Sequence, residues 1–139
     1  MDNITIRTVP SFLRIVPFAK KKLAFAIAPY IFLPDHQYED YMSGNPSPTT
    51  LGTIAHETVH IKREREQGLV RYGFKYLFSR SFRFEEELHA IAAQMKVYKD
   101  YGLVFDISKR AKMLSGPIYV YCVSYNEAKQ RLEDIWNKQ

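Results

Sequence analysis

Two histidines and a glutamate stand at a spacing that suits metal-assisted hydrolysis, in the segment His56-Glu57-Thr58-Val59-His60. In a helix, residues four apart lie one turn apart on one face, so His56 and His60 can share a metal ion, which we expect to be zinc. Glu57 lies about 100° further round the helix, where its carboxylate can reach a water on the metal without being a ligand. Zinc lowers the pKa of such a water, and Glu57 can take its proton as the water attacks a carbonyl.

A catalytic zinc site also needs a third protein ligand and an open fourth position. The acidic run Glu85–Glu87 opens a helix expected from about Arg83 to Tyr101. The apolar face of that helix is made by Phe84, Leu88, Ile91, Met95 and Tyr98. Glu87 flanks this face, Glu86 projects to the opposite side, and His89 points about 160° away from Glu87. We therefore predict Glu87 as the third ligand, with Glu86 as the alternative.

Hydrolysis next to zinc also calls for a hydrogen-bond donor to the developing oxyanion. Tyr76, Arg83 and His36, the last in an expected loop, have suitable side chains. Nothing in the sequence ranks the three. Arg83 can instead pair with Glu87 or Glu86 and orient a ligand.

The first third of the chain is expected to form a small sheet. Residues 4–18 suggest a short strand and then a turn or short helix near Phe12–Val16, and Leu23–Leu33 suggests two strand segments kinked at Pro29. Because proline is confined to edges and bulges, Leu23–Leu33 should have a free side that could pair with an extended substrate. Residues 34–50 are rich in Pro, Gly, Asn and Ser and predict a loop.

The remainder predicts helices. The motif helix is expected to be capped by Ser47, Thr49 or Thr50 and to end near Gly68; its apolar residues lie on several faces, which predicts burial. Further helices are expected over Tyr72–Phe78, Arg83–Tyr101, 106–114 and Tyr125–Asn137, the last with Ser124 and Glu127 as a capping box. Ile118–Val123 is either a strand or a connector. The fold class is therefore α+β, with a small, mostly antiparallel sheet packed on a helical bundle.

The composition bounds the class of protein. The chain has 139 residues, which predicts a single domain over 1–139. The formal net charge of +5 could favour anionic partners, but no helix-turn-helix, zinc-finger or RNA-binding pattern supports a nucleic-acid partner. Cys122 is the single cysteine, and neither a signal peptide nor a transmembrane segment is recognisable, so we expect a cytoplasmic protein with no membrane partner.

The order of these pieces resembles small bacterial and phage-encoded metallopeptidase-like proteins. The resemblance is carried by His56–His60, the tyrosine-containing stretch Gly73–Leu77, Arg83 and the E-x-x-A-x-x-x-Q pattern of Glu87–Gln94. It implies a minimal zincin core of the gluzincin type, with His, His and Glu as zinc ligands and Glu57 as general base. Two residues depart from that pattern, because Arg63 stands where glutamine is frequent and Lys62 where an apolar residue is usual.

Two functions are consistent with these observations. The first is a zinc-dependent metallopeptidase-like protein that hydrolyses peptide bonds in a peptide or protein substrate. The alternative is a non-catalytic zinc-binding structural or interaction protein that retains the motif. Glu57 favours the enzyme, because a structural site needs no base. The small size of the chain favours the alternative.

Overall fold

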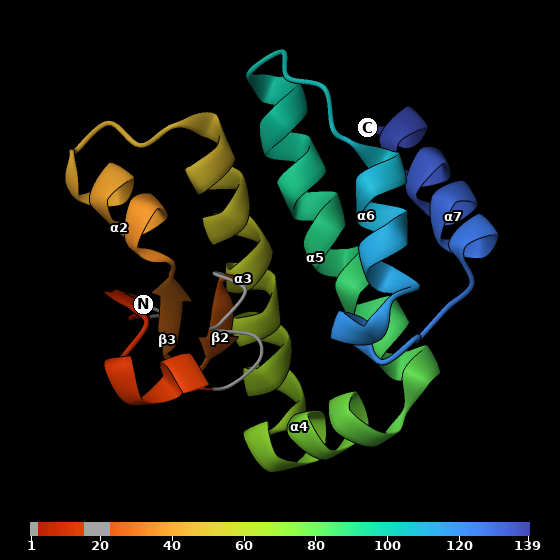
Figure 1. Ribbon diagram of the computed structural model, residues 1–139, viewed down its shortest axis with the longest axis horizontal. Helices are drawn as coiled ribbons and strands as arrows, with labels where there is room; N and C mark the ends of the chain where they lie inside the picture. The colour runs from red at the N-terminus through yellow and green to blue at the C-terminus, as the bar shows by residue number, and fades with distance from the viewer. Residues whose placement is uncertain (1–2, 16–22) are drawn as a thin grey trace.

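The computed structural model of the protein describes residues 3–15 and 23–139. In this part of the chain, a three-stranded sheet and the short helix α2 lie on one side, and the other helices make up the rest (Figure 1). The predicted α+β class, with a small sheet packed on helices, is confirmed.

The sheet contains β1 (Thr5–Thr8), β2 (Phe25–Ile27) and β3 (Tyr30–Leu33) in the order β1-β3-β2. β2 and β3 are antiparallel and separated by the predicted kink at Pro29. β1 pairs in parallel with β3, so the sheet is mixed and the predicted mostly antiparallel arrangement is wrong in this respect. A 3₁₀ turn, η1 (Ser11–Ile15), follows β1 near the predicted position, although Val16 lies outside the described residues. As predicted, β2 is an edge strand of this sheet, and it contacts α3.

Helix α2 (Asp35–Met42) occupies part of the segment predicted as a loop, so the loop prediction for 34–50 is wrong there. None of its residues is buried, and it therefore lacks the apolar stripe by which a helix is recognised in a sequence. Asp40 accepts hydrogen bonds from the Ser47 backbone nitrogen and hydroxyl, at 2.8 and 2.7 Å. These bonds attach α2 to the beginning of the next helix.

Three consecutive helices position the candidate site. They are α3 (Pro48–Gln67), α4 (Leu69–Phe78) and α5 (Arg80–Asp100). Ser47 caps α3, as one of the predicted alternatives, by accepting a hydrogen bond from the Thr50 amide. Gly68, with φ of 84°, ends α3 where predicted and lets the chain turn directly into α4. Ser79 caps α5 in the same way as Ser47 caps α3.

The end of the chain packs on α5. It comprises α6 (Ile107–Leu114), the 3₁₀ turn η2 (Pro117–Tyr119) and α7 (Tyr125–Lys138). The predicted cap of α7 is confirmed, since the Ser124 hydroxyl accepts from the Glu127 amide at 3.3 Å. Of the two possibilities for Ile118–Val123, the structure has the connector, which begins within η2.

Helices α3 and α5 are side by side at the centre of the molecule (Figure 1). They approach closely at Gly52, where a Cβ atom would lie 2.8 Å from the Tyr98 ring. One apolar cluster joins α3 to the sheet, and another joins α5 to α6 and α7. The interface between α3 and α5 is where buried polar side chains gather. In the described part of the chain, no helix has the length and apolar character needed to cross a membrane.

Candidate metal centre

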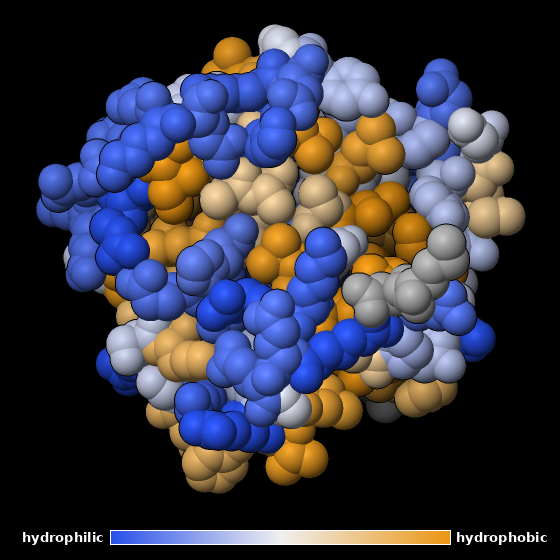
Figure 2. All heavy atoms as spheres, turned by 180° about the vertical axis from the view of Figure 1, so that it is seen from behind, coloured by the Kyte–Doolittle hydropathy of each residue, from blue (hydrophilic) through white to orange (hydrophobic). Residues whose placement is uncertain are grey.

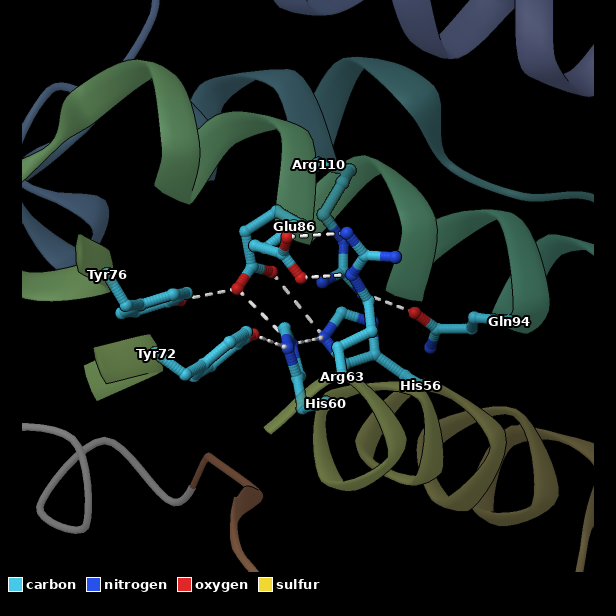
Figure 3. A network of polar contacts seen from close by, with 9 residues as sticks. His56, His60, Arg63, Tyr72, Tyr76, Glu86, Gln94 and Arg110 are labelled. Carbon is cyan, nitrogen blue, oxygen red and sulfur yellow. Dashed lines mark hydrogen bonds and ion pairs between the residues drawn. The ribbon is translucent and has the colours of Figure 1, made fainter. Parts of the chain in front are cut away.

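His56 and His60 on α3 and Glu87 on α5 bring their ligand atoms together at this interface. The two Nε2 atoms lie 3.2 Å apart. Glu87 Oε2 lies 3.5 Å from His56 Nε2, and Glu87 Oε1 lies 3.3 Å from His60 Nε2. Figure 3 shows the two imidazoles next to each other and facing the α5 carboxylates. The structure therefore brings together the three residues predicted as ligands.

These separations match what a zinc ion requires. Tetrahedral zinc with bonds of about 2.0–2.2 Å has ligand atoms roughly 3.3–3.6 Å apart. The separation of the two Nε2 atoms is next to this range, and each of these atoms has one oxygen of Glu87 within it, Oε2 for His56 and Oε1 for His60. In addition, Glu87 Oε2 is buried without a hydrogen-bond partner among the described residues. A buried polar atom without a partner destabilises the fold, and a cation would supply the missing interaction. The side chains present thus fit a bound metal ion.

Helix α4 supplies two tyrosines that hold the predicted ligands in place (Figure 3). The Tyr72 hydroxyl lies 3.0 Å from Nδ1 of His60, the ring nitrogen directed away from the ligand cluster. The Tyr76 hydroxyl donates a short hydrogen bond to Oε1 of Glu87. Hydrogen bonds of this kind fix the tautomer and orientation of metal ligands. Tyr76, predicted as an oxyanion donor, thus contacts a candidate ligand.

Without metal, the cluster contains an ion pair between His60 and Glu87. Burial lowers the pKa of His56 to about 4, so this imidazole is neutral. Burial would also lower the pKa of His60, but the adjacent Glu87 carboxylate outweighs it and raises that pKa to about 9. Burial would raise the pKa of Glu87, yet the charge of His60 and the close contacts with both imidazoles hold that pKa well below its usual range. The site therefore favours a cation at its centre.

Glu57 is buried beside this cluster on the same helix. Burial raises the pKa of its carboxyl group to about 7, although the charge of His60 acts in the opposite direction. A group with this pKa can both accept and return a proton near neutral pH. Its electrostatic surroundings thus suit the predicted role of general base.

Glu86, the alternative ligand, has another partner. Arg63 of α3 binds both of its carboxylate oxygens, one through Nε and the other through Nη2 at 2.8 Å. Glu86 is almost fully buried, and Arg63 is largely covered. One of the two residues that depart from the metallopeptidase-like pattern, Arg63, is therefore the ion-pair partner of Glu86.

The other predicted donors, Arg83 and His36, do not contact the candidate ligands. Arg83 is buried and donates to the backbone oxygens of Leu77, at 2.7 Å, and Tyr119, at 3.3 Å. The predicted pairing of Arg83 with Glu87 or Glu86 is therefore wrong, because the end of α4 and the η2 turn supply carbonyl acceptors. His36 is exposed on α2, so its predicted place in a loop is also wrong, and it does not belong to the cluster.

Two further residues interact electrostatically with the cluster, and neither was predicted as a site residue. Tyr119 is partly buried in η2, and burial together with the Glu87 charge raises the pKa of its hydroxyl. Arg110 on α6 donates to the Gln94 side chain at 2.9 Å, and its charge acts on Glu57 and His56. Gln94 is the last residue of the E-x-x-A-x-x-x-Q pattern shared with metallopeptidase-like proteins. Its hydrogen bond with Arg110 is the only link between Arg110 and a feature noted in the sequence.

The edge strand is attached to the motif helix. Glu64 on α3 accepts a hydrogen bond from the Ala28 backbone nitrogen at 2.9 Å, at the turn between β2 and β3. Burial raises the pKa of Glu64, although this bond acts in the opposite direction. The contact holds β2 beside the helix that carries His56 and His60, which is the arrangement expected for pairing with an extended substrate.

Comparison with known proteins gives no relative. No family model matches the chain, and no curated protein and no solved structure matches it significantly. The resemblance to metallopeptidase-like proteins therefore depends on the sequence motifs alone, and the convergence of His56, His60 and Glu87 is consistent with it.

Proposed function

We propose that this chain is a zinc-dependent metallopeptidase-like protein that hydrolyses peptide bonds in the cytoplasm. The observation that carries the proposal is the convergence of His56, His60 and Glu87, with Glu57 buried next to them. Its support is chemical, since two imidazoles and one carboxylate are the protein ligands of many catalytic zinc sites.

The residues have distinct roles in this proposal. His56, His60 and Glu87 would hold zinc, and Tyr72 and Tyr76 would orient His60 and Glu87. When bound, zinc would lower the pKa of a water molecule and polarise the substrate carbonyl.

Glu57 would accept a proton from the attacking water while the water oxygen bonds to the carbonyl carbon. It would return that proton to the nitrogen as the carbon–nitrogen bond breaks. The edge strand β2 is our proposed site for the substrate backbone.

The burial of the cluster favours a second candidate, a zinc-binding structural or interaction protein without turnover. His56, Glu57, His60 and Glu87 are each at most 9% exposed. So little exposure to solvent is typical of a structural zinc site, although such sites usually have a fourth protein ligand.

A peptide-cleavage assay separates the two candidates. The zinc-loaded chain is incubated with a mixture of unstructured peptides, and new termini are identified by mass spectrometry. The enzyme proposal predicts cleavage by wild type, and none by Glu57→Gln, which keeps the side-chain shape but cannot accept the proton. Glu66→Gln is the matched control, because Glu66 is exposed on the same helix.

Cleavage retained in Glu57→Gln would remove Glu57 from the role of base. A zinc-loaded wild type that cleaves no peptide would favour the second candidate.

A further inference from the structure

Helix α4 has one face on the candidate metal centre and the opposite face in solvent. Tyr72 and Tyr76 point toward His60 and Glu87 (Figure 3). The opposite side, which we call the α4 outer face, exposes large apolar side chains, with exposed fractions from 49% to 86%. They are Leu69, Val70, Phe74, Leu77 and Phe78.

Four of these five side chains form a continuous stripe. Val70, Phe74 and Phe78 are spaced by four residues, and Leu77 lies between the last two on the helix surface. The rings of Phe74 and Phe78 are in contact, with centroids 4.7 Å apart. α4 lies at one end of the molecule (Figure 1), and apolar side chains are also visible at that end from behind (Figure 2). Such a contiguous exposed stripe is typical of an interaction surface.

The charges around the stripe indicate what it binds. Residues 68–81 contain no acidic residue and three basic ones, Arg71, Lys75 and Arg80. By helical spacing, Arg71 and Lys75 follow the edge of the stripe. Arg71 and Arg80 are exposed, and Lys75 extends over the Phe82 ring at 5.3 Å. Contact between two copies would bring these cations together without a counter-charge, so self-association is disfavoured.

We propose that the α4 outer face docks on an anionic membrane surface. A helix with Phe and Leu on one side and Arg and Lys at its edge is typical of segments that lie in the membrane interface. The apolar side chains would enter the acyl boundary while the basic ones contact lipid phosphates. The sequence had led us to expect no membrane partner, because no transmembrane segment is recognisable in it. The sequence does not indicate which face of this helix is covered, so it did not point to binding at a membrane surface.

The side of α4 that faces the candidate metal centre packs on α3 and α5. Docking of the α4 outer face would not change these contacts. Membrane binding is therefore independent of zinc and of peptide hydrolysis. Either proposal can fail without the other.

Vesicle co-sedimentation of the full chain tests this inference. The probes are phosphatidylcholine vesicles and vesicles with equal parts of phosphatidylcholine and phosphatidylglycerol. We expect binding to the anionic vesicles only, weakened by salt, and reduced at least tenfold in Phe74→Ser/Phe78→Ser. Arg71→Gln/Arg80→Gln should reduce it several-fold. The altered side chains are exposed, so the variants should fold, which circular dichroism checks.

Matched controls remove similar side chains elsewhere. Tyr101→Ser/Val104→Ser changes exposed apolar residues beyond the end of α5, and Lys109→Gln/Lys112→Gln changes exposed charges on α6. Both should bind anionic vesicles like wild type. The inference is overturned if wild type ignores anionic vesicles, or if Phe74→Ser/Phe78→Ser binds them equally well. It is also overturned if sedimentation velocity shows that the chain forms a dimer that this variant loses.

Discussion

Arg63 on α3 binds both carboxylate oxygens of Glu86 on α5, which leaves the neighbouring Glu87 as the carboxylate that faces His56 and His60. Two adjacent glutamates thus have different roles. One pairs with a cation of the protein, and the other is placed to bind a cation from solution. This division explains how both are buried at the same helix interface.

Glu86→Gln should lower the free energy of unfolding, because Arg63 loses its charged partner while remaining largely covered. Since Arg63 keeps some contact with water, we expect a loss of about 1–3 kcal/mol, below that of a fully buried pair. Urea unfolding of the zinc-loaded chain measures it. The control is Glu85→Gln, whose exposed pair with Arg131 should contribute at most about 1 kcal/mol. Equal losses in the two variants would contradict the role given to Glu86.

Tyr72→Phe and Tyr76→Phe should each weaken zinc binding, because each removes a hydroxyl that orients a ligand. Losses of such contacts typically reduce metal affinity roughly 10–100-fold. Competition with a chromogenic chelator measures the affinity. Tyr101→Phe, at an exposed tyrosine, should bind zinc like wild type. Unchanged affinity in both variants would mean that the hydroxyls do not orient the ligands.

Zinc affinity should depend on pH through His60. The Glu87 carboxylate raises the pKa of His60 to about 9, so in the metal-free chain this imidazole carries a proton at neutral pH. Zinc binds unprotonated imidazole, and the proton must therefore leave. Affinity should fall roughly tenfold per unit as the pH decreases from about 8 to 6. Calorimetry in buffers of different ionisation enthalpy counts the protons, and none released at neutral pH would contradict the charge state given to His60.

Removing zinc should destabilise the chain without unfolding it, because α3 and α5 each keep an apolar core. At a free zinc concentration a thousand times Kd, binding contributes about 4 kcal/mol. Each kcal/mol corresponds to about 2–4 °C in a domain slightly larger than this one. Thermal melts with and without a strong chelator should therefore differ by at least about 8 °C. Equal melting temperatures, after zinc is shown to be removed, would mean that zinc binding does not stabilise the folded chain and would contradict this prediction.

The sequence was informative where a local pattern determines the structure. The i, i+4 histidines and the apolar face beside Glu87 sufficed to predict which three residues come together. Gly68 predicted where α3 ends and Ser124 predicted where α7 begins, because helix capping depends on local sequence. α2 was missed because it buries no residue.

Contacts that depend on tertiary packing could not be predicted in this way. The hydrogen bond between Tyr72 and His60 depends on how α4 folds back on α3, and the burial of Tyr119 depends on the η2 turn. Arg83 was assigned a partner by charge alone, whereas the structure offers it the carbonyls of Leu77 and Tyr119.

The most direct test of the account is the zinc content of the purified full chain, measured by elemental analysis after dialysis against zinc. We predict about one zinc per chain in wild type and in Glu86→Ala, and loss of zinc in His56→Ala, His60→Ala and Glu87→Ala, with all variants folded by circular dichroism. Full zinc occupancy in Glu87→Ala together with loss in Glu86→Ala, or no zinc in a folded wild type, would contradict the metal centre described here.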